Sequence, residues 1–194
     1  PTLMTGSAFG PTSFMKGVDA ATYATPLAQI KEAGALNTSF VDLLVGNCGG
    51  TIGETCAIAL ILGGIYLIVK KVISWRTPVV YIATVLVLTY IFKLSGIEAA
   101  SARQPIQELF AGGLMLGAFF MATDYASTPV TPKGKIIMGL GCGIITVLIR
   151  VFGGYPEGVS YSILLMNLAA PLIDRYTAPK KFGYVKPVKV KEVK

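Results

Sequence analysis

Histidine is absent from this sequence of 194 residues, and cysteine occurs only three times. The three cysteines, Cys48, Cys56 and Cys142, form no Cys-x-x-Cys pair. Because zinc and haem iron are held mainly by histidine and cysteine, these absences exclude a zinc or haem site built by this chain alone. We expect each cysteine to be a packed small side chain. A cluster shared with a partner chain stays open.

Charged residues are also scarce. They make up 14% of the chain, against about 25% in an average soluble domain. Hydrophobic residues make up 53%, and the mean hydropathy is +0.65. This composition excludes an ordinary soluble enzyme and predicts an all-α membrane protein. The length leaves room for several helical spans of about 20 residues each.

The chain divides into three predicted parts. Its first 30 residues lack the pattern of a signal peptide, and glycine and proline interrupt residues 1–37, which we expect to form a loop segment with short helical pieces. Residues 38–176 are the predicted membrane domain, and residues 177–194 form a basic tail. Since the sequence starts at Pro1, we expect it to be the C-terminal part of a longer subunit. The predicted spans are the apolar runs 52–69, 77–94, 105–122, 135–152 and 158–174.

Two short runs, 40–46 and 106–112, share one pattern: an apolar residue, any residue, an acid, leucine, two apolar residues and glycine. Their acids, Asp42 and Glu108, fall where a helix would begin, and a carboxylate suits that positive end. We interpret the runs as a pair of half-helices related by a weak internal repeat. Chance similarity between apolar segments is the alternative.

Basic residues are spread unevenly around the predicted spans. If the C-terminus is cytoplasmic, twelve of the 17 lysines and arginines fall on the cytoplasmic side and five on the other. Cytoplasmic loops of membrane proteins carry such an excess. The sequence therefore predicts a cytoplasmic tail and places residues 1–37 on the outer side. The tail also explains the net charge of +7 without a nucleic-acid partner.

Residues 19–25 carry the most informative motif. They resemble the Asp-x-x-Ser/Thr-Gly-Ala-Thr signature at which flavin transferases attach flavin mononucleotide (FMN), through its phosphate, to the last threonine. That threonine is Thr25 here, and the sequence departs from the signature at Tyr23, where glycine is usual. Attachment needs an accessible hydroxyl, which a loop offers. The residues of the motif are Asp19, Thr22, Tyr23, Ala24 and Thr25.

Two later stretches carry the resemblance further. Residues 120–131 read Phe-Met-Ala-Thr-Asp-Tyr-Ala-Ser-Thr-Pro-Val-Thr, and residues 149–159 contain Gly-Gly-Tyr-Pro-Glu-Gly and are followed by Leu-Leu-Met-Asn at 164–167. Together with the motif at 19–25, these stretches resemble the D subunits of Rnf complexes over about residues 14–176. The B subunits of the sodium-pumping NADH:quinone reductase (Nqr) are similar but more distant.

The resemblance implies a fold similar to that of urea transporters, with re-entrant half-helices. It also implies an electron-transfer subunit, incomplete as an enzyme alone, in a complex that passes electrons between ferredoxin and NAD while moving sodium ions or protons. The implied cofactor is FMN on Thr25, and a second, non-covalent flavin such as riboflavin stays open. The implied partners are other Rnf subunits, including a neighbouring FMN-carrying subunit, a flavin transferase and membrane lipid. The implied location is a bacterial or archaeal cytoplasmic membrane.

Asp124 and Glu157 lie in predicted loops beside spans. An ionisable group near membrane depth is a candidate for function, here for binding an ion or tuning a flavin, and helix capping is the alternative for each. Arg150 and Asn167 lie within predicted spans and must find hydrogen-bond partners, because unpaired polar groups are costly in hydrocarbon. We predict no catalytic residue and no metal ligand, since a cofactor would supply the redox chemistry.

Two other functions stay open. The half-helices and the repeat also suit a channel or transporter for a small neutral solute, which would need a path through the membrane and no flavin. A purely structural membrane scaffold would leave the motif at 19–25 unexplained. A flavin that stays on the denatured chain would separate the electron carrier from both.

Overall fold

The computed structural model describes residues 25–33, 40–46, 54–96 and 104–179, and each regular element among them is a helix. The predicted all-α class is therefore confirmed for the described residues. The elements, in chain order, are α1 (Pro26–Ala33), α2 (Phe40–Val45), α3 (Ala57–Val69), α4 (Arg76–Leu94), α6 (Pro105–Phe110), α7 (Leu114–Leu116), the π-helical turn η1 (Gly117–Met121), α8 (Pro132–Phe152) and α9 (Val159–Thr177).

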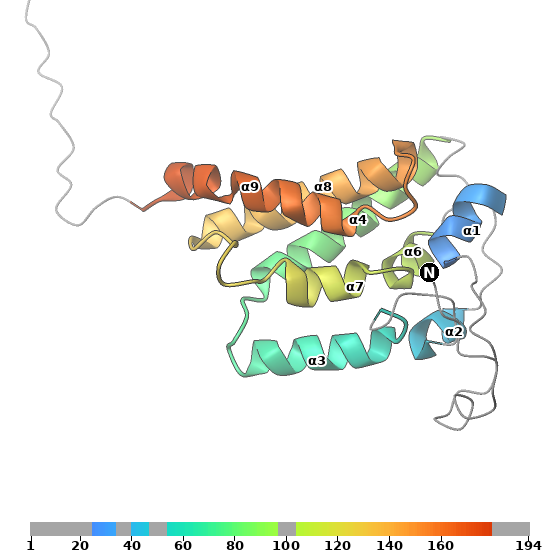
Figure 1. Ribbon diagram of the computed structural model, residues 1–194, viewed down its shortest axis with the longest axis horizontal. Coiled ribbons are helices and arrows are strands. Elements are labelled where there is room, and N and C mark those ends of the chain that lie inside the picture. Colours follow the sequence, from blue (N-terminus) through green and yellow to red (C-terminus); the bar gives the residue numbers. More distant parts are fainter. Residues whose placement is uncertain (1–24, 34–39, 47–53, 97–103, 180–194) are drawn as a thin grey trace, which may run out of the picture.

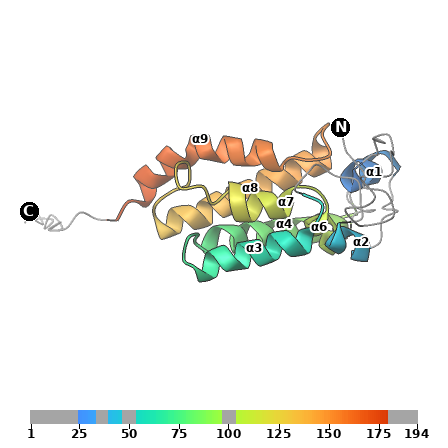
Figure 2. The ribbon, with the colours of Figure 1, turned by 60° about the horizontal axis from the view of Figure 1, so that its bottom comes forward.

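The longer helices lie side by side in an elongated bundle (Figures 1 and 2). α4 and α8 run in one direction along the bundle, whereas α3, α7 and α9 run in the other. The short helices α1, α2 and α6 gather at one end, which we call the Thr25 end. The opposite end holds the loops at 70–75 and 122–131 together with the starts of α4 and α8 (Figure 1). We call it the basic end, after Lys70, Lys71, Arg76, Lys133 and Lys135.

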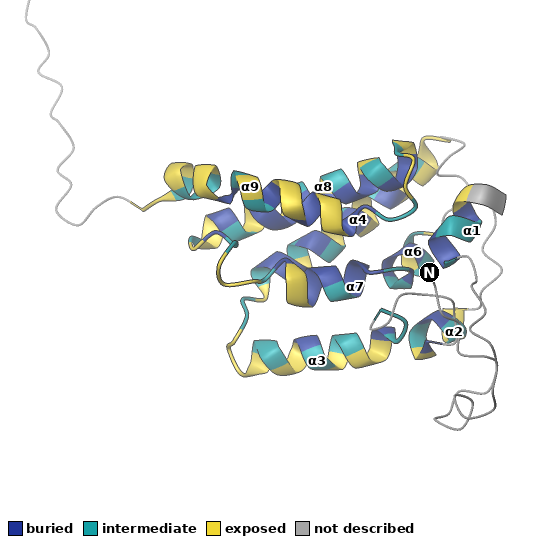
Figure 3. Ribbon diagram, in the orientation of Figure 1, coloured by how far each residue is buried: buried dark blue, intermediate teal, exposed yellow. Residues whose placement is uncertain are grey.

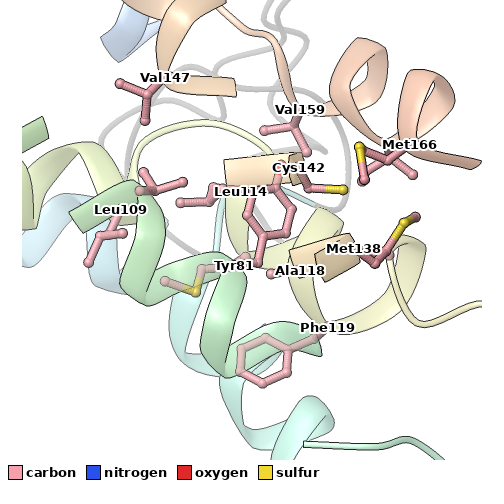
Figure 4. Packing of buried hydrophobic residues seen from close by; sticks show 14 of the residues in the cluster. Tyr81, Leu109, Leu114, Ala118, Phe119, Met138, Cys142, Val147, Val159 and Met166 are labelled. Atoms are coloured by element: carbon pink, nitrogen blue, oxygen red, sulfur yellow. The ribbon is translucent and has the colours of Figure 1, made fainter. Parts of the chain in front are cut away.

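The core lies where α4 packs against α8, with α7, η1 and α9 around them (Figure 4). Tyr81 and Cys142 are fully buried in it, so Cys142 is a packed small side chain, as predicted. Gly139 and Gly143 let the two backbones approach, because a Cβ on Gly139 would lie 2.9 Å from the carbonyl oxygen of Thr77. Small residues serve this purpose in membrane helix pairs.

Three buried hydroxyl groups join α4, α8 and α9 inside this core. The hydroxyl of Tyr81 lies 2.7 Å from Oγ1 of Thr146 and 3.2 Å from Oγ of Ser162, and the last two oxygens are 2.7 Å apart. Polar side chains of this kind hold helices together where water is absent. The network fixes the three helices in register, so the two ends of the bundle are held at a defined separation.

Exposed residues occur along each of the long helices (Figure 3), and many of them are large apolar side chains. On α9, for example, Leu164, Leu168 and Leu172 are exposed. A helix occupies each of the five predicted apolar runs, with the third divided among α6, α7 and η1. By length and composition, α4 and α8 are the two described helices that could cross a membrane, whereas α3 has 13 residues. These features support a membrane protein, while the count of five spans stays a prediction.

The two runs of the predicted repeat, 40–46 and 106–112, form helices α2 and α6, and each ends in a glycine with a left-handed backbone. The φ angle is +96° at Gly46 and +71° at Gly112. Asp42 and Glu108 lie in the first turns of their helices, as predicted. Beyond each break a longer helical segment follows: α3 after α2, and α7 with η1 after α6 (Figure 1). The re-entrant course and the likeness to urea transporters stay predictions.

Candidate functional site

Thr25 is the residue that opens α1. Its Oγ1 accepts a hydrogen bond from the backbone N–H of Ala28 at 3.2 Å, and its carbonyl oxygen accepts one from Gln29 at 2.9 Å. Threonine is a favoured N-cap because its oxygen satisfies a backbone N–H of the first turn, and Pro26 suits the first helical position. The side chain of Thr25 is half-buried. The other motif residues, Asp19, Thr22, Tyr23 and Ala24, lie outside the described residues.

Helix α1 is packed firmly onto the Thr25 end of the bundle. Leu27 and Ile30 are 1% and 5% exposed, and they form a second apolar cluster with Leu43 of α2 and with Ala111. On the exposed side, the ammonium group of Lys31 donates a hydrogen bond to the carbonyl oxygen of Gly153. These contacts hold Thr25 at a fixed place relative to the bundle.

Two glutamates meet at the break between α6 and α7. A Cβ on Gly112 would overlap the carboxylate of Glu157 and the side chain of Leu27, and a Cβ on Gly113 would lie 2.5 Å from Oε1 of Glu54. The two carboxylates therefore lie against a pair of adjacent glycines. Leu27 is two residues from Thr25 and meets the same Gly112 Cβ position as Glu157, so Glu157 lies beside the helix that Thr25 opens.

Glu157 has an altered acidity in this setting. Its pKa is raised from the ordinary value of 4.5, mainly because burial disfavours the ionised carboxylate. The negative charge of Glu54 raises the pKa further, and the positive charge of Arg150 opposes the shift in part. A carboxyl group with a raised pKa can hold a proton at a pH where ordinary glutamates have lost theirs.

Arg150 has hydrogen-bond partners in the structure, as the sequence analysis predicted for a polar group in an apolar run. Its side chain is fully buried, and its guanidinium donates to the carbonyl oxygens of Glu108 at 2.9 Å and Ala111 at 3.4 Å. These oxygens belong to the last turn of α6 and to the break, where helical donors are missing. Arg150 thus stabilises the broken helix from the neighbouring α8. Asn167 is half-buried on α9, and no hydrogen bond of its side chain is found within the described residues.

Asp124 lies in the loop after η1, at the basic end of the bundle (Figure 1). Its carboxylate accepts a hydrogen bond from Oγ of Ser127 at 3.1 Å. The structure therefore brings Glu157 to the same end as Thr25 and leaves Asp124 at the other. The predicted role of either acid in binding an ion or a flavin stays a prediction.

Glu54 is the acid of this site that sequence reasoning missed. It lies in a turn just before α3 and belongs to none of the motifs. Its proximity to Glu157, more than one hundred positions later in the sequence, arises only from packing of α3 beside α7. The glycine pair at 112–113 is the one weak sequence signal for this contact, because adjacent glycines often mark a close approach by another group.

Nearly the whole chain matches a known protein family. The sequence profile described as the NQR2, RnfD, RnfE family matches residues 1–183. The D subunit of the Na(+)-translocating ferredoxin:NAD(+) oxidoreductase complex of Acetobacterium woodii is 50% identical over 179 residues, which cover 90% of this chain and 53% of that protein.

Two further relatives agree with this match. The D subunit of the proton-translocating ferredoxin:NAD(+) oxidoreductase complex of Clostridium ljungdahlii is 50% identical over 176 residues, 86% of this chain and 53% of the relative. The D subunit of the ion-translocating oxidoreductase complex of Pseudomonas paraeruginosa is 39% identical over 171 residues, 87% of this chain and 49% of the relative. The chain spans about half the length of these relatives.

Proposed function

We propose, from the premise that the chain belongs to the NQR2, RnfD, RnfE family, that it transfers electrons within a D subunit of an ion-translocating ferredoxin:NAD oxidoreductase complex and carries FMN on Thr25. Two relatives with 50% identity are named as D subunits of such complexes, one translocating sodium and one translocating protons. The observation that carries the proposal is Thr25 itself, because the last hydroxyl of the attachment motif begins a helix anchored to the bundle.

The surroundings of Thr25 suit a phosphate ester. A phosphate on Oγ1 would lie at the N-terminus of α1, where backbone N–H groups lack helical acceptors and the helix dipole is positive. Pro26 contributes no N–H, and the N–H of Ala28 already donates to Oγ1 of Thr25, so the N–H of Leu27 is the nearest remaining donor of the first turn. The threonine is half-buried, so its side chain is not sealed within the bundle.

The flavin would supply the redox chemistry, and the protein would hold it in place. Leu27 and Ile30 anchor α1, and Lys31 ties the same helix to the loop after α8. Glu157 lies beside Leu27, and burial raises the pKa of its carboxyl group. Membership of this family is also compatible with a second, non-covalent flavin. It is equally compatible with the alternative that the chain is a B subunit of Nqr.

The partners in this proposal are the other subunits of the complex, including an FMN-carrying neighbour at the Thr25 end, a flavin transferase and membrane lipid. The protein lies in the cytoplasmic membrane with its basic end toward the cytoplasm. The sorting of Lys70, Lys71, Arg76, Lys133 and Lys135 to one end, opposite α1, supports this orientation.

Flavin fluorescence of the denatured protein tests the attachment. The protein is isolated from its membrane, separated in a denaturing gel and illuminated, because a covalent ester survives unfolding and a flavin bound in a pocket does not. We expect fluorescence from the native sequence, none from Thr25→Ala, and retention in Thr25→Ser, which keeps a hydroxyl. Thr177→Ala, at the other end of the bundle, serves as the matched control and should keep full fluorescence. A dark native band would favour the solute-transporter alternative.

A further inference from the structure

Helix α3 ends in an unusual backbone conformation at Lys71. The φ angle of Lys71 is +57°, and it is the one non-glycine residue with a positive φ in the described part of the chain. Its N–H donates to the carbonyl oxygen of Ile68 at 2.9 Å, and the N–H of Val72 donates to that of Leu67 at 3.0 Å. These two bonds form a Schellman motif, in which glycine is the usual residue at this position because it adopts a left-handed backbone without strain. A lysine here costs stability, which indicates that its side chain has another use.

Two further cations near Lys71 lie against exposed aromatic rings. The ammonium group of Lys70 lies 5.8 Å from the ring centre of Tyr66. The guanidinium of Arg76 lies 5.8 Å from that of Trp75, and both distances are within the range of a cation–π interaction. The two rings are 61% and 57% exposed. Tyrosine and tryptophan in such places are typical of the membrane–water interface, so the three basic residues lie at the depth of lipid headgroups if α4 crosses a membrane.

The loop that carries these cations is compact. The residues that follow Lys71 and Arg76 in the sequence together line one cavity of about 150 Å³, so the backbones at these two positions lie close together. The hydroxyl of Tyr125 donates a hydrogen bond to the carbonyl oxygen of Val72. This bond ties the loop between η1 and α8 to the loop between α3 and α4, and Figure 1 shows both loops at the basic end. The basic residues therefore belong to one defined area of the surface.

The acids near this area are engaged elsewhere. Asp124 accepts a hydrogen bond from Oγ of Ser127 at 3.1 Å. Asp174 accepts two from the backbone N–H of Val130, at 3.1 and 3.3 Å. Within the described residues, neither acid forms an ion pair with the three basic residues. The area therefore keeps a positive charge, which attracts an anionic group.

An apolar strip on α3 leads to the same lysines. Leu62, Tyr66 and Val69 are 63%, 61% and 71% exposed, and their spacing of four and then three places them on one face of the helix. We call these three residues the α3 strip. Val69 is followed directly by Lys70, so the strip ends at the basic residues. A molecule with an anionic head and an apolar chain complements this surface, whereas an acidic peptide would leave the strip uncovered.

We propose that Lys70, Lys71 and Arg76 bind the headgroup of an anionic phospholipid whose acyl chains lie along the α3 strip. Lys71 distinguishes this site from a general excess of basic residues, because glycine would end α3 with less strain and would carry no charge. A single basic residue near an anionic lipid contributes about fivefold in affinity. The proposal does not depend on a flavin at Thr25.

Binding of two defined lipids to the protein, isolated from its membrane in detergent, tests the proposal. Phosphatidylglycerol and phosphatidylcholine with identical acyl chains are compared by native mass spectrometry, because their headgroups differ in net charge. We expect phosphatidylglycerol to bind at least about tenfold more tightly, and the preference should fall as the salt concentration rises, since salt screens exposed charges. Equal binding of the two lipids would contradict the proposal and would favour an acidic protein segment as the partner of this surface.

Variants of Lys71 separate lipid binding from a purely structural role. Lys71→Gly relieves the left-handed strain, so the Tm should rise by about 2–4 °C, while the affinity for phosphatidylglycerol should fall about fivefold. Lys71→Gln should cause the same fall in affinity without the rise in Tm, and Lys71→Arg should keep the affinity. Lys93→Gln is the matched control, because Lys93 is exposed in the last turn of α4, at the Thr25 end. An unchanged affinity in Lys71→Gly and Lys71→Gln, or an equal loss in Lys93→Gln, would overturn the proposal.

Discussion

At the residue scale, Thr25 has two roles, as the cap of α1 and as the proposed acceptor of the flavin. The capping role is directly visible in the hydrogen bond from Ala28. Loss of such a cap costs about 1 kcal/mol, whereas α1 is also held by the burial of Leu27 and Ile30. Thr25→Ala should therefore lose the flavin while the bundle stays folded, so the variant tests attachment separately from folding.

Glu157 should make the stability of the protein depend on pH. Its pKa is raised in the folded state, so the folded chain binds the proton more tightly than the unfolded chain does. The stability that the bound proton contributes is complete below the ordinary pKa of 4.5. It is lost as the pH rises through the raised pKa of the folded state. Thermal unfolding in detergent should show this decline for the native sequence, and Glu157→Gln should remove it because an amide carries no charge.

The control for this prediction is Glu54→Gln. It removes the neighbouring negative charge and leaves Glu157 able to ionise, so the decline should persist with its midpoint at a lower pH. An unchanged pH profile in Glu157→Gln would show that another group causes the dependence.

Some residues of the candidate site could be predicted from the sequence, and others could not. Thr25 and Glu157 were found because they belong to contiguous motifs. Glu54 was missed, since an acid in a loop has no periodicity or spacing that reports its packing partner. The requirement that Arg150 find partners was predictable from its apolar surroundings, but the partners are backbone carbonyl oxygens, which no side-chain pattern reveals.

At the scale of elements, the two breaks in the helices determine the shape of the Thr25 end. The break after α6 places Gly112 and Gly113 against Glu157 and Glu54. The break after α2 places Gly46 against the backbone of Thr55 and Cys56, with 3.0 Å between a Cβ there and the Thr55 carbonyl oxygen. Each break thus brings another segment of chain close to a glycine that has no side chain to displace it.

Gly112→Ala should disturb the Thr25 end. A non-glycine residue in the left-handed region costs roughly 1–2 kcal/mol, and the added Cβ must also displace Glu157 and Leu27. We expect a total loss of about 2–4 kcal/mol in the free energy of unfolding, measured by chemical or thermal unfolding in detergent. Protection of α1 against hydrogen exchange should fall at the same time, because Leu27 anchors that helix.

Gly96→Ala separates the two causes. Gly96 also has a positive φ, +68°, but nothing lies within 4 Å of its Cβ position. It should therefore show only the backbone cost of roughly 1–2 kcal/mol and no change in α1. Equal effects of the two substitutions would mean that the contacts with Glu157 and Leu27 contribute nothing.

The predictability of the elements follows from local signals. Long apolar runs predicted helices at 77–94 and 135–152, where α4 and α8 are found at 76–94 and 132–152. The third run was predicted as one span, whereas the structure divides it at Gly112–Gly113 and continues it through a π-helical turn. Arg150 and the two glutamates lie against this break and belong to other segments, so the local sequence of the run does not reveal them.

At the scale of the whole molecule, the two ends have opposite characters. Helix α1, which Thr25 opens, the break between α6 and α7 and the loop after α8 lie at one end (Figure 1), and the loops that carry the basic residues lie at the other. The proposed role as an electron carrier requires such a polarity, because cofactor and partner must meet on the same side of the membrane. The basic excess predicts which end is cytoplasmic.

Labelling of introduced cysteines tests this orientation. In a background that lacks the native cysteines, Lys31→Cys reports the Thr25 end and Ser127→Cys reports the basic end; both positions lie on exposed or loop surfaces. A membrane-impermeant thiol reagent added to intact cells should label the first and spare the second until the membrane is opened. Labelling of Ser127→Cys in intact cells would reverse the topology.

The proposed function depends most on the covalent flavin at Thr25, which peptide mass spectrometry can detect directly. Trypsin should release residues 17–31 from the protein isolated from its own membrane, since Lys16 and Lys31 flank the motif. We predict that this peptide is heavier by one FMN less one water, with fragment ions that place the addition on Thr25 and not on Thr22. A peptide at its unmodified mass, from a complex that is active and fully assembled, would contradict the proposed attachment.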